Sequence, residues 1–159
     1  MLTFAGTAVQ GRGFGVPGID ESLLEAMRLP GARGASVVDW ISGLALGAVG
    51  DAPGGDAEAT AAETAELARL ATESGVLALT GGDDDAGETT GDGPGGPSGK
   101  EPPVQDLIIT NADSYHLLRF VTTTFDSTVF VHLWLDRGEG NLALARIRLA
   151  EMADRLVLG

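Results

Sequence analysis

The chain has 159 residues, 43% of them hydrophobic and only 5% aromatic, which predicts a single core filled mainly by Ala, Leu and Val. Its net charge of −13 disfavours nucleic acid and anionic membrane surfaces as partners, because both attract clusters of Lys and Arg. The absence of cysteine excludes disulfides, thiolate catalysis and metal sites built from thiolates.

The N-terminal part of the chain predicts a loose lead followed by a helix. Residues 1–18 are expected to form a flexible lead, and residues 19–159 a single domain. The stretch "IDESLLEAMRL", residues 19–29, carries Leu and Met near helical spacing. Asp20 is the expected N-cap of this helix.

A hairpin and a second helix come next. Two short strands are expected over residues 35–40 and 44–49, joined by a turn at Ser42 and Gly43. An alanine-rich helix is expected over residues 57–79. One line along this helix carries larger residues, Leu67, Leu70, Ser74 and Leu77, and a smooth flank of Ala61, Ala65, Ala68 and Ala71 permits a close approach by a neighbour.

A long acidic segment then interrupts the domain. Residues 81–103 contain eight Gly and four Pro, no aromatic or large aliphatic residue, and a net charge of −5. Such a segment buries too little apolar surface to offset its conformational entropy. We therefore expect a disordered loop.

The C-terminal part predicts three strands and a helix. The runs "VQDLIIT", "YHLLRFVT" and "TVFVHLWLD" read as strands, and the last two are apolar on both faces, which is typical of central strands. The final helix begins after Asn141, a good N-cap, and has the apolar stripe Leu142, Ala145, Leu149, Met152 and Leu156. The expected class is α+β, a five-stranded antiparallel sheet with helices on its faces in the order α-ββ-α-βββ-α.

One glycine motif has the spacing found in nucleotide-binding sites. Gly13, Gly15 and Gly18 have the G-x-G-x-x-G spacing of a dinucleotide-binding turn, and Asp39 follows at the distance of a ribose-binding acid. That motif requires parallel βαβ units, whereas the strand after it is expected to turn straight back. We interpret the glycines as a lead into the helix, with no cofactor bound.

Other candidate sites are weaker. His116 and His132 would need a third ligand such as Asp113 or Asp136 to hold zinc, and neither has a recognised ligand spacing. Asp83–Asp85 lacks the pattern of a calcium loop, and no G-x-S-x-G elbow marks a serine nucleophile. No metal site and no catalytic residue are therefore predicted.

Arg146 and Arg148 are two further candidate functional residues. An arginine such as Arg146 or Arg148 can stabilise a transferring phosphate when inserted into a GTPase, although an ordinary polar helix flank explains both.

No apolar run approaches the roughly 18 residues of a spanning helix, and the N-terminus lacks a basic region followed by an apolar stretch. A soluble cytoplasmic protein is expected.

The sequence resembles the roadblock (dynein light-chain roadblock) domain family, in a bacterial form. The resemblance is carried by "LPGARGASVVDWISGLAL" after the first helix and by "YHLLR", a hydrophobic strand and "LDRGEGNLALAR" before the last helix. It covers about residues 19–80 and 104–156. Family members usually join the middle helix to the next strand by a short turn, whereas here residues 81–103 intervene.

The resemblance implies a non-enzymatic homodimer. Family members pair an edge strand and the middle helix across a two-fold axis, and bacterial members often act on small Ras-like GTPases. It therefore predicts a regulatory module that binds and modulates such a GTPase; the alternatives are an adaptor in a signalling or motility assembly and an uncharacterised hydrolase. The dimer interface is expected at Leu67, Leu70, Ala71, Leu107 and Ile109.

Overall fold

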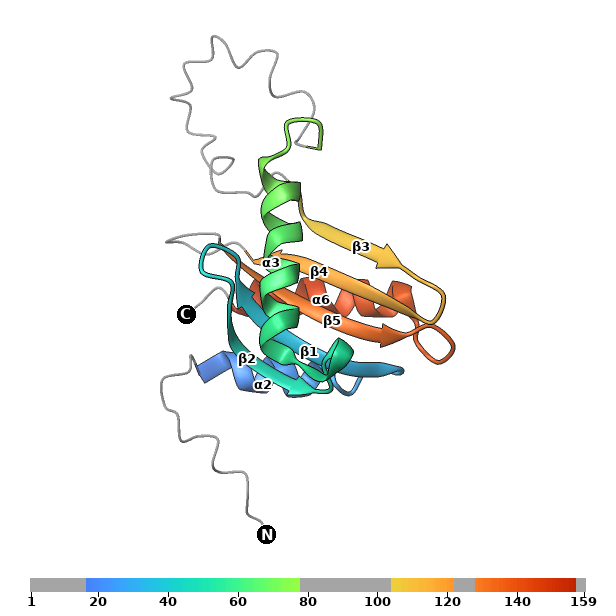
Figure 1. Cartoon of the computed structure of the whole chain (residues 1–159). Coiled ribbons are helices and arrows are strands. Elements are labelled where there is room, and N and C mark those ends of the chain that lie inside the picture. Colours follow the sequence, from blue (N-terminus) through green and yellow to red (C-terminus); the bar gives the residue numbers. More distant parts are fainter. Residues whose placement is uncertain (1–16, 78–103, 122–127, 157–159) are drawn as a thin grey trace, which may run out of the picture.

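The computed structural model describes residues 17–77, 104–121 and 128–156. Their elements follow in the predicted order, with one short 3-10 turn added (Figure 1). The elements are α2 (Pro17–Ala26), β1 (Ala32–Asp39), β2 (Leu44–Gly50), η1 (Pro53–Gly55), α3 (Ala57–Glu73), β3 (Asp106–Thr110), β4 (Ser114–Val121), β5 (Val129–Asp136) and α6 (Leu142–Leu156).

The strands form one five-stranded antiparallel sheet with the order β2-β1-β5-β4-β3. This confirms the predicted fold class. β4 and β5, which are apolar on both faces, lie inside the sheet as expected, and β3 lies at one edge. β2 forms the opposite edge.

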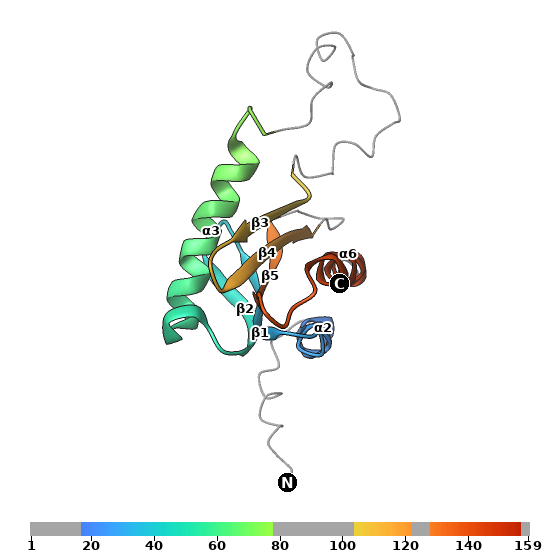
Figure 2. The same cartoon turned by 90° about the vertical axis from the view of Figure 1, so that its right-hand side faces the viewer.

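Helices cover both faces of the sheet. α2 and α6 lie on one face, and α3 lies across the other (Figure 2). The α2–α6 side holds the larger core cluster, which includes Leu23, Leu133 and Leu149. The α3 side holds a smaller one, in which Ala61, Ala65 and Ala68 pack against Phe120 and Phe130.

Small residues of α3 allow this helix to pack closely on the sheet. Asp56 caps its N-terminus by accepting from the Ala59 N–H at 3.0 Å. The alanine flank predicted to admit a neighbour is buried against the chain's own sheet, because the short side chains let α3 approach Phe120 and Phe130. The helix ends at Glu73 rather than at residue 79, and Ser74 follows it in an extended conformation.

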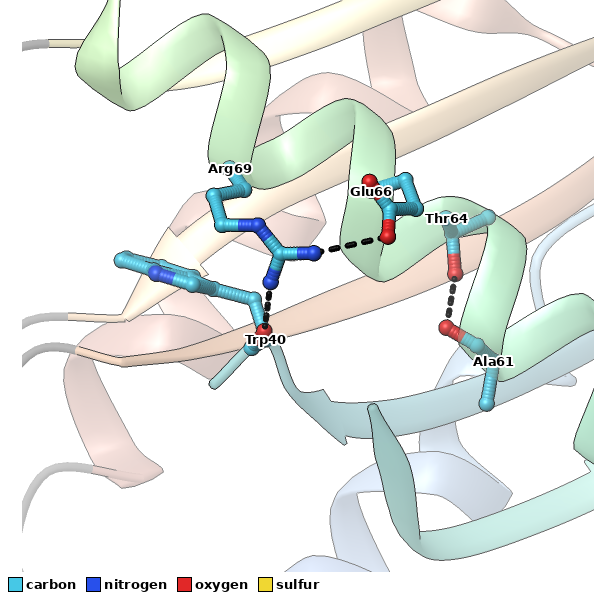
Figure 3. A network of polar contacts seen from close by, with 5 residues as sticks. All are labelled: Trp40, Ala61, Thr64, Glu66 and Arg69. Carbon is cyan, nitrogen blue, oxygen red and sulfur yellow. Dashed lines mark hydrogen bonds and ion pairs between the residues drawn. The ribbon is translucent and has the colours of Figure 1, made fainter. Parts of the chain in front are cut away.

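A polar network fixes α3 to the end of β1. Arg69 donates to the backbone oxygen of Trp40 at 3.2 Å and to Glu66 at 2.8 Å (Figure 3). Thr64 donates back to the carbonyl oxygen of Ala61 one turn earlier, so its hydroxyl is satisfied inside the helix. The position of α3 on the sheet is therefore set by polar contacts as well as by packing.

The first helix differs from its prediction at its start. α2 begins at Pro17, which suits a first helical turn because its missing N–H would have no partner there. Asp20 consequently lies inside the first turn, so the predicted N-cap is wrong. The N-cap of α6 is confirmed, since Asn141 accepts from the Leu144 N–H at 3.0 Å.

A close crossing of two chain segments depends on glycine. The N–H of Asp51, just after β2, donates to the backbone oxygen of Arg33 at 2.8 Å. A Cβ added to Gly34 would lie 1.8 Å from the Asp51 backbone oxygen. Only glycine therefore allows the end of β2 to lie against β1 in this way.

The predicted lead over residues 1–18 is too long by two residues, because Pro17 and Gly18 belong to α2. The rest of that lead, residues 1–16, and the predicted acidic loop over residues 81–103 lie outside the described residues. Among the helices that the structure describes, none is long and apolar enough to cross a membrane.

Candidate functional site

An open groove runs between α3 and the β3 edge of the sheet. It has a volume of about 500 Å³. Leu67 and Glu63 of α3 form one wall, and Ile109 of β3 lies across from them with His116 of β4. The remaining lining comes from η1, the N-terminal half of α3 and the sheet floor: Pro53, Gly54, Asp56, Ala59, Thr60, Thr64, Leu118 and His132.

The groove is bordered by apolar side chains that the described part of the chain leaves exposed. Leu70 is 68% exposed and Leu67 is 38% exposed, although both belong to a helix that packs on the sheet. Leu107 and Ile109 are half-buried on the α3 side of β3, where Leu107 touches the small core cluster. Ala71 differs from the other predicted interface residues because it is buried within this chain.

β3 offers its backbone next to this groove. Within the described residues it pairs only with β4, so one row of its N–H and C=O groups has no strand partner. A strand edge with unpaired backbone groups can form hydrogen bonds with a strand of another chain. The groove, the two leucines and the open edge together form a continuous surface, which we call the α3–β3 surface.

The outer face of α3 is acidic. The helix contains four glutamates, Glu58, Glu63, Glu66 and Glu73, against the single Arg69. All four glutamates are exposed, and Arg69 is already bound to Glu66. A protein partner that meets this face would be favoured by a basic patch, through attraction that salt screens.

The two histidines are brought together. His116 Nδ1 lies 3.0 Å from His132 Nε2, and the imidazole planes are inclined by only 17°. Both histidines line the groove; His132 is buried and His116 is half-buried. The sequence placed both residues on neighbouring strands but contained no signal for their direct contact.

The contact between the two histidines does not form the zinc site that the sequence analysis considered and set aside. Among the described residues no group of three or more His, Asp or Glu is placed to hold a metal ion. Asp136, one of the two proposed third ligands, instead accepts from the Glu139 N–H at 2.8 Å and closes the turn after β5. The histidine pair is therefore a hydrogen-bonded unit in the wall of the groove.

The glycine motif does not lie in a dinucleotide-binding context. Gly13 and Gly15 are outside the described residues, and Gly18 lies in the first turn of α2. The strand that follows, β1, pairs antiparallel with both of its neighbours. The parallel βαβ arrangement that such a fingerprint requires is not formed by these strands.

Several solved structures share the fold of this chain. No family model matches the chain, and no curated protein matches it. Among solved structures, Myxococcus xanthus MglB is 15% identical, with 99% of this chain and 92% of that chain covered at a TM-score of 0.63. A Roadblock/LC7 domain from Streptomyces avermitilis is 17% identical, with 86% and 92% covered at a TM-score of 0.57.

A further solved structure, described as MglB with a tetrameric arrangement, is 18% identical, with 87% of this chain and 85% of that chain covered at a TM-score of 0.60. At these identities the comparisons concern the fold. All of these structures align over most of both chains, and the α-ββ-α-βββ-α order predicted from the sequence is the order observed. The chain therefore has the fold of the bacterial roadblock-type domains.

Proposed function

We propose that this chain is a non-enzymatic, homodimeric regulatory module that binds and modulates a small Ras-like GTPase. The observation that carries the proposal is the α3–β3 surface on a roadblock fold. Among the described residues, an open strand edge lies there beside two leucines that no other described segment covers. Both features are costly to leave in water and are removed together by a second copy.

In the proposed dimer the two β3 strands pair across a two-fold axis. Leu67 and Leu70 of each copy then pack at the centre, and Ile109 lies below them in the groove wall. Leu107 and Ala71 support the contact from within each protomer. The description of a solved MglB as tetrameric supports self-assembly on this fold.

The GTPase assignment rests on the fold and on charge. Bacterial proteins of the roadblock family, which the sequence resembles, act on Ras-like GTPases, and the MglB and Roadblock/LC7 structures support this fold-level analogy. The acidic outer face of α3 is suited to a basic patch on the partner. The module would act by contact, positioning the switch segments of the GTPase itself.

A matched pair of leucines tests the dimer. Light scattering should give the mass of two chains for the parent protein at pH 7.5. Leu70→Lys should shift it to one chain, because a charge replaces a leucine at the centre of the contact. Leu24→Lys should leave the dimer intact, since Leu24 is similarly exposed (60%) but lies on α2, across the sheet.

A Ras-like GTPase from the same genome then tests the partner. Calorimetry should detect binding to the parent dimer, with an affinity that falls as salt is raised. Binding without any change in nucleotide hydrolysis or release would favour the adaptor. A monomeric parent protein at micromolar concentration would contradict the proposed dimer.

A further inference from the structure

The only two histidines of the chain form one pair in the wall of the α3–β3 groove. In the β4–β5 register His116 lies opposite Trp134, and Leu118 lies opposite His132, so the histidines are diagonal neighbours on the α3 side. His132 is 3% exposed, and the ring of His116 lies nearly parallel to that of Trp134. Both rings line the groove, and His116 is the member of the pair that is more exposed to solvent.

Their contact is a hydrogen bond between neutral rings. With 3.0 Å between His116 Nδ1 and His132 Nε2, one of these nitrogens carries the hydrogen and the other accepts it. A metal ion would need both lone pairs, and one is already used in the bond. When His116 Nδ1–H is the donor to His132 Nε2, the Nε2 of His116 keeps a free lone pair, and a proton is taken up at that nitrogen.

The charged groups around the pair come from several elements. Asp113 precedes β4, Asp56 and Glu63 line the groove from the α3 side, and Asp51 lines a hollow beside His132. The guanidinium of Arg33, on β1, lies 4.3 Å from the centre of the Trp134 ring. Of these groups, the carboxylate of Asp113 favours a charged His116.

Burial acts in the opposite direction. It lowers the pKa of His116, and Asp113 partly opposes this effect. Burial, with a smaller contribution from the charge on His116, lowers the pKa of His132 to about 3. As pH falls, His116 is therefore protonated first, and His132 stays neutral.

We infer that protonation of His116 opens the contact between two copies of this chain. The inference rests on the proposed function, since it requires that a second copy cover the α3–β3 groove. Covering the groove removes His116 and its neighbours from water, which favours the neutral ring. A charged ring keeps its hydration only while the groove is open, so the proton and the second copy compete.

The direction and size of the effect follow from proton linkage. The dimer holds His116 neutral to a lower pH than the monomer does, so association is strongest above the pKa of His116 in the monomer. It weakens as pH falls through that value. A two-fold dimer contains two such residues, so its dissociation constant should rise by up to about a hundredfold per pH unit.

The experiment is a dissociation constant measured by analytical ultracentrifugation between pH 8.0 and pH 5.5. We expect the dissociation constant of the parent dimer to rise several-fold over this range. General electrostatics predicts the reverse, because protonating carboxylates reduces the repulsion between chains of charge −13. Weakening at low pH is thus specific to a group that becomes positive.

Two variants separate titration from structure. The side-chain amide of His116→Asn can still donate to His132 Nε2 but does not titrate, so this variant should dimerise at pH 7.5 and lose the pH dependence. Asp113→Asn removes a charge that favours protonated His116, so the midpoint of the parent's pH dependence should move to lower pH.

The results that overturn the inference are distinct from those that overturn the dimer. A parent dimer of constant affinity between pH 8.0 and 5.5 contradicts the inference alone, and so does an unchanged pH dependence in His116→Asn. A chain that is monomeric at pH 7.5 contradicts the proposed function, and the inference fails with it. NMR titration of the two histidines supplies an independent readout: His116 should titrate at lower pH in concentrated than in dilute protein.

Discussion

Arg146 of α6 donates from Nε to Asp106 Oδ2 at 2.9 Å, which ties the last helix to the edge strand β3. Arg119 approaches the same carboxylate from β4, at 3.9 Å. The hydrogen bond and the negative charge of Asp106 raise the pKa of Arg146. Arg146 is thus engaged within the chain, on the sheet face opposite α3.

This pairing predicts the outcome of Arg146→Ala. An arginine inserted into a GTPase accelerates hydrolysis by about 10³-fold or more, and losing one would remove that factor. We expect a change of less than tenfold in the GTPase rate measured with the variant. Arg148→Ala tests the second exposed arginine of α6, two residues further along, and we expect an equally small change. A loss of about 10³-fold with either variant would establish an arginine finger.

Gly34→Ala should be among the most damaging single substitutions. The added methyl would meet the Asp51 backbone oxygen at 1.8 Å, so the close crossing of β1 and β2 would have to open. We expect a loss of about 3 kcal/mol in the free energy of unfolding, measured by urea denaturation. Gly75→Ala, where a Cβ would meet nothing within 4 Å, should change it by less than about 1 kcal/mol. Equal effects would show that the crossing is not tightly packed.

The buried His132 predicts a stability that declines in mild acid. Burial lowers its pKa to about 3 in the folded chain, whereas an unfolded chain accepts the proton near pH 6.5. The full contribution is present above pH 6.5 and is lost as pH falls from there toward 3, by up to about 1.4 kcal/mol per pH unit. Urea denaturation at pH 7.0 and 5.5 measures it in the Leu70→Lys variant, in which the proposed dimer should not form and so should not interfere.

His132→Gln provides the comparison, because its side chain does not titrate. Its free energy of unfolding should fall less between pH 7.0 and 5.5 than that of the histidine form. The same slope in both proteins would mean that His132 already takes up its proton in the folded state.

Much of the fold could be predicted from the sequence, because the periodicity of apolar residues is strong in β4, β5 and α6. The stripe of Leu149 and Met152 is buried as expected, and β3 lies at the sheet edge. Pattern alone did not identify which partner the alanine flank of α3 meets. Small residues allow close packing on any surface, and here that surface is the chain's own sheet.

The histidine pair could not be predicted for a different reason. Diagonal contact between His116 and His132 depends on the register of β4 against β5, and a slip of one residue would place one ring on the other face. The sequence fixes which strands carry the histidines. Their register is determined by packing of the whole sheet.

The central claim is that a dimer formed through the α3–β3 surface changes the activity of a Ras-like GTPase. Its most direct test is single-turnover GTP hydrolysis, with nucleotide release measured in parallel, by a Ras-like GTPase from the same genome. We expect the parent dimer and Leu24→Lys to change one of these rates several-fold, and Leu70→Lys to leave both near the value of the GTPase alone. Unchanged rates with the parent dimer, at concentrations that saturate binding, would contradict the account.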